Sequence, residues 1–289
     1  MHNLSGRGQR LSSRTALSLV LTACLSACSQ QSTYHRPELD VAPAWQQDAR
    51  DLGGQQAGLW WQGFRDPALD QLVDKVLAAN PDMQVAGLRL KSALLGADLA
   101  DTNLTPSVNA SLGASGNKNI KDGSASSNLG PSFNLSYEVD LWGRLASVRD
   151  QAQWEAEASE QDLATTRLML VGKTLEQYWQ LAYLGSALSL GERQLANYER
   201  IERLTRAKYD AGAVTRLDLV QASQQKAGKQ AELASLTLQR EQAGNALRLL
   251  LGRSSGPLEF APTSLAMGPI PTLAVGIPAD VLARRPDVR

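Results

Sequence analysis

The stretch SFNLSYEVDLWGRLASVRD, residues 132–150, contains the point at which the hydrophobic pattern of the chain changes. Up to this point apolar residues alternate with small or polar ones, and such a two-residue period predicts a β-strand. The apolar members of the pattern are Leu129, Pro131, Phe133, Leu135, Tyr137 and Val139. From Gly143 to Tyr209 there is no proline, and residues that favour helices dominate. This run predicts a single helix, roughly 100 Å long at 1.5 Å per residue.

A second alternating run lies upstream of this stretch. Its apolar positions are Val108, Ala110, Leu112 and Ala114, separated by Ser, Asn and Gly residues. The polar loop GNKNIKDGSASSN, residues 116–128, joins the two runs. Two strands that are apolar on one face and small or polar on the other are typical of a transmembrane β-hairpin, which we place at residues 107–142. Periodicity alone fits a soluble hairpin packed on a helix at least as well, so both interpretations stay open here.

Two shorter helices are expected before the strands, within residues 59–106. Asp66 followed by Pro67 is a helix start, because the carboxylate can accept from first-turn amides and proline needs no amide partner there. One face of this helix is apolar, at Leu69, Leu72, Val73 and Val76. Asn80 and Pro81 then interrupt the helix and begin a second one.

The long helix is expected to turn at DAGAVTRLD, residues 210–218. Gly212 can adopt the left-handed conformation that ends a helix, while Thr215 and Asp218 have the spacing of a capping box for the next one. The two helices together predict a helical hairpin over residues 143–251.

Both helices of this hairpin carry apolar residues at coiled-coil spacing. In the first they are Leu181, Leu184, Leu188, Leu195 and Tyr198. The second helix has two stripes, one of Val220, Ala227, Ala231, Ala234 and Leu238, and another of Leu233, Leu236, Ala243, Leu247 and Leu250. A two-stranded coiled coil needs one seam, so two stripes predict a neighbour on each side, as in a cylinder of helices.

Residues 1–27 have the organisation of a secretory signal peptide. Three arginines without an acid precede the apolar run at 15–25, which is too short to span a bilayer as a helix. The sequence then reads Leu-Ser-Ala-Cys and resembles a bacterial lipobox, which implies cleavage between Ala27 and Cys28 and acylation of the Cys28 thiol. The polar segment 28–58 would be a tether. The alternative is ordinary cleavage after Ala27, which would leave a free thiol.

Composition argues against nucleic-acid binding and against enzymatic chemistry. The chain has 29 Lys and Arg residues and 29 Asp and Glu residues; loss of the signal removes three arginines, which leaves 29 − 3 = 26 basic residues and a net charge of −3. No basic surface for nucleic acid is indicated. The mature chain would keep one histidine, His35, and an acylated Cys28, so we expect no catalytic residue, no metal site and no cofactor. A lipid-anchored periplasmic enzyme is disfavoured for the same reason.

Four segments carry more specific patterns. They are WWQGFRDPALDQLVDKVLAANPDMQVA at 60–86, SYEVDLWGR at 136–144, KYDAGAVTRLDLVQA at 208–222 and IPADVLARRPDVR at 277–289. In this order they resemble segments of the outer-membrane efflux proteins of the TolC and OprM type, in the lipoprotein branch called the NodT family. The second is the most specific, and the residues that match the family's junction between strand and helix are Glu138, Asp140, Trp142, Gly143 and Arg144.

The resemblance implies an α+β fold: a helical hairpin of a periplasmic α-barrel and a β-hairpin of an outer-membrane β-barrel. It implies a homotrimer in the outer membrane that exports small compounds such as drugs passively, with a periplasmic adaptor and an inner-membrane pump as partners. The sequence does not identify the cargo. The residues that would touch the adaptor are Asp210, Gly212, Thr215, Arg216 and Leu217, the alternative being a plain solvent-exposed helix connection.

A lipid-anchored periplasmic adaptor or scaffold protein is the main rival interpretation. Adaptors place their helical hairpin between the halves of a small β-domain, whereas here the strands precede the long helix. In the efflux family, a linker such as residues 252–289 leads into a second copy of the helix and strand unit, which would hold most gate residues. The chain therefore resembles an N-terminal half, and we expect a 289-residue product to form no conducting pore by itself, as a non-functional truncated channel would.

Overall fold

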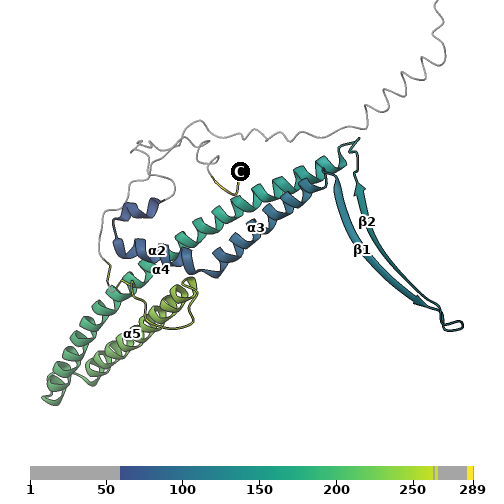
Figure 1. Cartoon of the computed structure of the whole chain (residues 1–289). Helices are drawn as coiled ribbons and strands as arrows, with labels where there is room; N and C mark the ends of the chain where they lie inside the picture. Colours follow the sequence, from purple (N-terminus) through teal and green to yellow (C-terminus); the bar gives the residue numbers. More distant parts are fainter. Residues whose placement is uncertain (1–58, 263, 266–284, 289) are drawn as a thin grey trace, which may run out of the picture. The chain divides into compact units, whose positions relative to one another are not determined.

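The computed structural model describes residues 59–262, 264–265 and 285–288. In chain order the elements are the 3-10 helix η1 Trp60–Phe64, helices α2 Pro67–Ala79 and α3 Pro81–Thr102, strands β1 Ser107–Lys118 and β2 Ala125–Ser136, and helices α4 Arg144–Asp210 and α5 Arg216–Leu250 (Figure 1). The predicted α+β class, a long helical hairpin with a two-stranded β-hairpin, is confirmed. Ala27, Cys28 and the tether lie outside the described residues.

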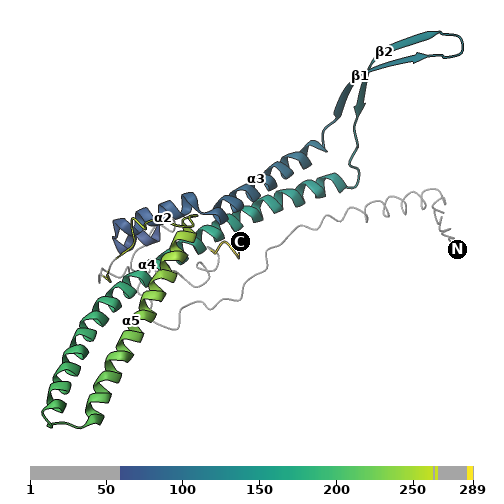
Figure 2. The ribbon, with the colours of Figure 1, turned by 90° about the horizontal axis from the view of Figure 1, so that it is seen from below.

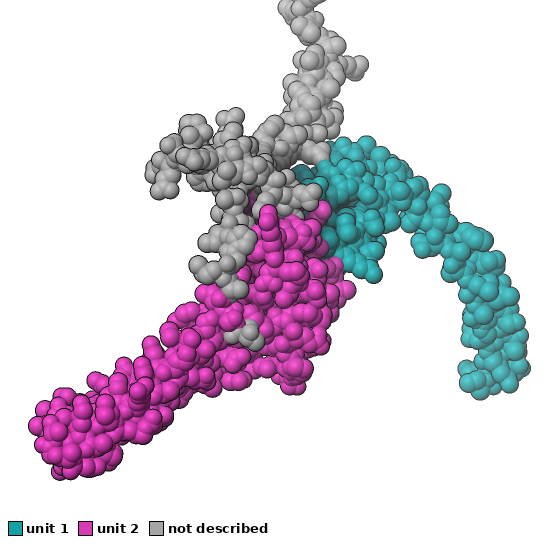
Figure 3. Space-filling model, turned by 90° about the vertical axis from the view of Figure 1, so that its left-hand side faces the viewer, with its two compact units in different colours: residues 1–38, 90–158 teal, residues 39–89, 159–289 magenta. Residues whose placement is uncertain are grey.

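The chain divides into two compact units, which Figure 3 colours separately. Of the described residues, 90–158 form one, the strand unit, which contains the β-hairpin and the adjoining ends of α3 and α4. The described residues of 59–89 and 159–288 form the other, the helical unit, which contains α2 and the paired parts of α4 and α5. Among the described residues no helix is both long enough and apolar enough to cross a membrane.

The core of the helical unit lies where α2 packs on α4 and on the end of α5. Helix α2 begins as predicted, since Oδ1 of Asp66 accepts from the amides of Ala68 at 3.0 Å and Leu69 at 3.3 Å. The expected apolar face is buried, and the core consists of Trp61, Leu69, Leu72, Val73, Val76, Val171, Leu175, Tyr178, Leu181, Leu184, Ala243 and Leu247. Each large side chain buried here stabilises the fold by about 1.5–3 kcal/mol.

The break between α2 and α3 also fixes the end of α5. Oδ1 of the buried Asn80 accepts from the amide of Asp82 at 2.8 Å and caps α3, while its Nδ2 donates to the Leu250 carbonyl at 2.9 Å. Two residues later α5 has ended, and Gly252 has a φ of +67°. A Cβ on Gly252 would lie 2.8 Å from the Ala79 carbonyl oxygen, so the close approach of the two helix ends requires glycine.

Helices α4 and α5 run side by side to the turn that joins them (Figure 2). Of the two predicted stripes on α5, the one from Leu233 to Leu250 is buried or half-buried, whereas the one from Val220 to Leu238 is exposed throughout. The seam is tight at Gly191, where an added Cβ would lie 2.7 Å from Cδ2 of Leu233. One stripe thus packs within the chain, and the other stays uncovered.

In the described residues of the strand unit, β1 and β2 form one antiparallel pair that is in register over its full length. We expected the alternation to continue to Val139, but β2 ends at Ser136, so Tyr137 and Val139 lie beyond it. The ladder ends there because Ser136 pairs with Ser107, the first residue of β1, and beyond it the chain bends to Asp140, which caps α4.

Candidate functional site

One face of the β-hairpin is apolar and uncovered. In the ladder Val108 lies opposite Leu135 and Leu112 opposite Pro131, and Ala110 faces Phe133. The pleat therefore places all the alternating apolar residues of both strands on one side. Every residue of both strands is exposed, and Phe133 is 79% exposed. Among the described residues no helix covers either strand, and the soluble and the transmembrane interpretations of the hairpin both stay predictions.

The opposite face of the hairpin is polar and small. The pairs along it are Ser107 with Ser136, Asn109 with Asn134, Ser111 with Ser132, Gly113 with Gly130, Ser115 with Asn128 and Asn117 with Ser126. Two of these pairs join hydroxyl to hydroxyl, at 2.7 Å for Ser107 and Ser136 and 2.8 Å for Ser111 and Ser132. The hairpin thus has two chemically distinct faces, and neither packs on another element of the part of the chain that the structure describes.

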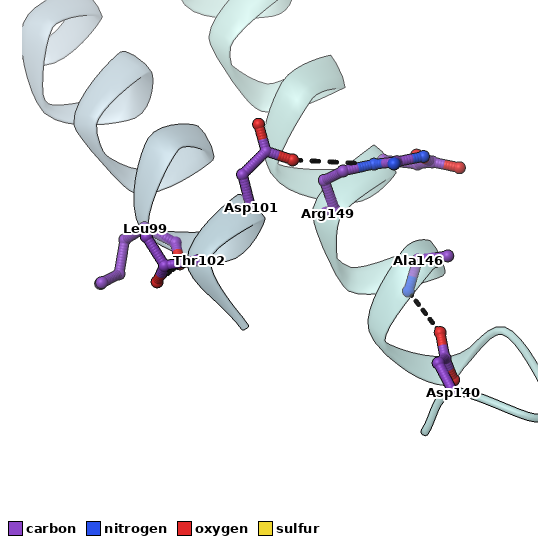
Figure 4. A network of polar contacts seen from close by, with 7 residues as sticks. Leu99, Asp101, Thr102, Asp140, Ala146 and Arg149 are labelled. Carbon is purple, nitrogen blue, oxygen red and sulfur yellow. Dashed lines mark hydrogen bonds and ion pairs between the residues drawn. The ribbon is translucent and has the colours of Figure 1, made fainter. Parts of the chain in front are cut away.

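The predicted junction residues gather between β2 and α4. Oδ2 of Asp140 accepts from the Ala146 amide at 2.8 Å, so this carboxylate caps a helix that begins four residues later (Figure 4). Gly143, with a φ of +70°, makes the sharp bend that this cap requires. The Arg144 guanidinium pairs with Oε1 of Glu138 at 2.6 Å. The structure therefore brings these four residues together around one bend.

Trp142, the fifth junction residue, is exposed.

An ion pair joins α3 to α4 next to the hairpin. One turn into α4, Arg149 reaches across to the end of α3, where its Nε lies 3.9 Å from Oδ1 of Asp101 (Figure 4). This ion pair links the helix that enters the hairpin to the helix that leaves it. Sequence reasoning missed it, because the two residues are separated by both strands.

The turn between α4 and α5 has the predicted caps. The Ala213 amide donates to the Lys208 carbonyl at 2.8 Å, and Gly212 has a φ of +72°. The Thr215 amide donates to Oδ2 of Asp218 at 2.8 Å, which completes the capping box. The candidate contact residues of this turn, Asp210, Gly212, Thr215, Arg216 and Leu217, are all exposed.

A polar cluster interrupts the seam of the helical hairpin near this turn. Glu202 on α4 accepts from Nζ of Lys226 at 2.6 Å and from the Ser223 hydroxyl at 2.9 Å, both on α5. These bonds lower the pKa of Glu202, the Lys226 bond having the larger effect. The Glu202 side chain is only 13% exposed. Sequence reasoning missed this cluster too; the available signal was a charge at a position where the heptad pattern of α4 expects an apolar residue.

The helical unit also has an apolar pocket of about 230 Å³ beside α2. It is lined by Leu72, Leu247, Phe260 and their neighbours, and Nζ of Lys75 lies 4.2 Å from the centre of the Phe260 ring. Lys75 also pairs with Glu259 at 2.8 Å.

Across the part of the chain that the structure describes, no three His, Cys, Asp or Glu side chains are grouped as a metal site would need.

Comparison with known proteins places this arrangement in a family. The model of the outer membrane efflux protein family matches residues 72–253, which include both strands, the junction and the helical hairpin. The chain belongs to this family.

Two relatives are named for export. Toxin and drug export protein A of Aggregatibacter actinomycetemcomitans is 29% identical over 279 residues, which are 96% of this chain and 60% of the relative. The pyoverdine export outer membrane protein OpmQ of Pseudomonas putida is 33% identical over 292 aligned positions, with 94% of this chain and 59% of the relative covered. The chain thus spans about 60% of the length of these relatives.

Two solved structures share the fold. The outer-membrane channel OprN has a TM-score of 0.69 at 26% identity, and covers 90% of this chain with 60% of its own. The open state of the MtrE outer membrane channel of Neisseria gonorrhoeae has a TM-score of 0.71 at 25% identity, over 90% of this chain and 59% of its own.

Proposed function

We propose that this chain is the outer-membrane channel component of a tripartite efflux system, and that it serves the passive export of small compounds. The observation that carries the proposal is the β-hairpin, whose apolar face is exposed along both strands while its other face is polar. Membership of the outer membrane efflux protein family and the export names of two relatives support it.

The exposed apolar face is best explained by contact with lipid. A soluble protein does not leave a row of large apolar side chains uncovered without a partner, and transfer of each from water to hydrocarbon gains about 1.5–3 kcal/mol. A pair of strands has two outer edges whose backbone groups need partners within a bilayer. Strands from further copies would satisfy them, so we propose a homotrimer. Trp142 would lie at the lipid–water interface, where amphipathic rings are favoured.

The turn between α4 and α5 is proposed to contact a periplasmic adaptor, which would in turn engage an inner-membrane pump. Its exposed Leu217 and its rigid double cap, at Gly212 and Thr215, support this proposal, since a defined surface suits recognition. Gly212→Val would strain the backbone at a φ of +72° and should weaken both the helix end and adaptor crosslinking. Undiminished crosslinking after changes throughout the turn would place the contact elsewhere.

Cys28 is proposed as the lipid attachment site, with Ala27 as the last residue of the signal. A palmitate analogue supplied in growth medium should label the wild-type chain. The Cys28→Ala variant should remain unlabelled, and persistent labelling of that variant would overturn the assignment.

Membrane insertion of the hairpin is tested by placing a charge on either face. In the Cys28→Ala background, Phe133→Asp should abolish resistance of the chain to alkaline extraction from outer membranes, since an aspartate would face hydrocarbon. Ser132→Asp is the matched control on the polar face and should remain in the membrane. Equal extraction of both variants would contradict the proposal.

A further inference from the structure

The polar face of the β-hairpin consists of only three residue types. The six paired positions between Ser107 and Asn117 on β1, and between Ser126 and Ser136 on β2, are all Ser, Asn or Gly. Over its whole length this face carries no acidic, basic or aromatic side chain. The charged residues of the hairpin lie at its loop end, at Lys118, Lys121 and Asp122.

Such a surface is hydrated, but its side chains create no electrostatic potential of predominantly one sign. Hydroxyl and carboxamide groups both donate and accept hydrogen bonds, so they hold water without a preference for anions or cations. Channels that select ions by charge do so with rings of charged side chains, which this face lacks. Ser107 and Ser111 each bond to the serine across the ladder, which keeps their side chains close to the backbone.

The opposite face independently indicates which side the water is on. Its exposed residues include Val108, Leu112, Leu129, Phe133 and Leu135. Because the pleat alternates strictly, lipid contact on that face leaves the Ser, Asn and Gly face toward the interior. The two faces are thus separated by chemistry as well as by geometry.

We propose that the Ser, Asn and Gly face is a charge-indifferent wall of the export path, along which hydrated solutes of either sign or of none move equally well. This inference rests on the proposed function, since it needs the hairpin to be in the membrane. It adds the class of solute that this part of the path admits, and it assigns no charge selection to the hairpin.

Thiol reagents of opposite charge test the wall directly. Ser111→Cys and Ser132→Cys, each made in the full chain in its own outer membrane, would be treated with sulfonatoethyl and with trimethylammonioethyl methanethiosulfonate. After division by the rates with a free thiol in solution, the two rate constants should agree within about threefold at both positions. A tenfold or larger preference for one charge would overturn the inference. The parent chain measures any reaction at Cys28.

A charge placed next to the reactive thiol is the control that shows whether the assay can detect an electrostatic potential on this face. Asn109→Asp, added to Ser111→Cys, should raise the ratio of cationic to anionic reagent rates at least fivefold, since opposite charges attract across a few ångströms. An unchanged ratio would mean that the reagents do not pass along this face, and would overturn the inference.

Cysteines on the apolar face distinguish two ways in which the inference could be wrong. Either the hairpin is not inserted in the membrane, or it is inserted and its polar face does not line the export path. Leu112→Cys and Leu135→Cys should react with neither reagent when lipid covers them. If they react as fast as Ser111→Cys, the hairpin is not in the membrane and the proposed function fails. If they are protected and the wall thiols are protected as well, the hairpin is inserted but its polar face is covered by protein, and only the wall is wrong.

Discussion

The Tyr178 hydroxyl donates a 2.6 Å hydrogen bond to Oδ2 of Asp66, a residue 112 positions earlier in the chain. The other carboxylate oxygen of Asp66 caps α2, so one side chain both begins α2 and fastens it to α4. Burial raises the pKa of Tyr178, and the bond to Asp66 raises it further. The tyrosine therefore stays a neutral donor at every physiological pH.

Tyr178→Phe should lower the free energy of unfolding by about 1.5–3 kcal/mol, the usual range for a hydrogen bond to a charged partner. The ring would still fill its place in the core, so the loss reports the bond and not a cavity. Urea unfolding of the detergent-solubilised chain, followed by helical circular dichroism, measures it. Tyr183→Phe on the exposed side of the same helix is the control and should change little. Equal effects of the two substitutions would contradict a role for the Asp66 bond.

Asp70→Asn should stabilise the chain at neutral pH. Oδ1 of Asp70 is enclosed and has no hydrogen-bond partner among the described residues. Burial raises the pKa of Asp70, and the carboxylates of Asp66 and Asp74 raise it further. A carboxyl group with a raised pKa in the folded state contributes stability below its unfolded pKa and loses it as the pH rises through the folded value. The ionised group therefore opposes folding at pH 7.

The pH dependence distinguishes this effect from a general one. The advantage of Asp70→Asn over the wild type should shrink as the pH falls to about 4 and below, where Asp70 itself is protonated. Asp74→Asn, at an exposed position one turn later, should give a much smaller difference at pH 7. An advantage that does not vary with pH would contradict the assignment to the Asp70 charge.

Local signals in the sequence were sufficient for the helix ends, because each end depends on residues within one turn. Asp66 before Pro67, Asn80 before Pro81 and Thr215 before Asp218 all predicted helix starts that the structure contains. The two-residue period likewise predicted both strands, but the polar segment 116–128 expected as the loop lies partly in them, since β1 runs to Lys118 and β2 begins at Ala125. It did not predict the end of β2, since the alternation itself continues to Val139. The end of β2 is set by its partner, since β1 begins at Ser107 opposite Ser136, and the chain then bends to Asp140, which caps α4.

Contacts distant in sequence could not be predicted in this way. Nothing near Tyr178 indicates Asp66 as its partner, and nothing near Asn80 indicates the Leu250 carbonyl. The two stripes on α5 looked equivalent, and only the path of α4 determines which one is buried. The period of the strands also could not distinguish a soluble hairpin from one that faces lipid, because that difference lies in what covers the apolar side.

Glu202→Gln should make the helical hairpin less sensitive to acid. The bonds from Lys226 and Ser223 lower the pKa of Glu202. A carboxylate with a lowered pKa contributes stability above its unfolded pKa and loses it as the pH falls through the folded value. The wild type should therefore exceed Glu202→Gln in stability at pH 7, and the difference should shrink as the pH falls below the ordinary glutamate pKa of about 4.3 and through the lowered pKa of the folded state.

The control for Glu202→Gln is Glu232→Gln. Glu232 pairs with Lys229 at 2.9 Å, but its side chain is 56% exposed, and exposed pairs contribute little. Thermal unfolding at a series of pH values should show a widening gap with pH for Glu202→Gln and almost none for Glu232→Gln. Parallel curves for the wild type and Glu202→Gln would mean that the seam cluster does not stabilise the hairpin.

Gly191→Ala and Gly172→Ala should differ in their effects, although both replace a glycine in the interior of α4. Alanine in a helix interior is favoured over glycine by about 1 kcal/mol, and Gly172 has no atom within 4 Å of an added Cβ, so Gly172→Ala should gain this amount. At Gly191 the Cβ would lie 2.7 Å from Cδ2 of Leu233, and that side chain must move within the seam. Gly191→Ala should therefore be at least about 1 kcal/mol less stabilising than Gly172→Ala. In a Leu233→Ala background this obstacle is gone, and Gly191→Ala should recover the full gain in stability. A double-mutant cycle measures this coupling between the two positions. Absence of coupling would mean that Leu233 does not limit the space at Gly191.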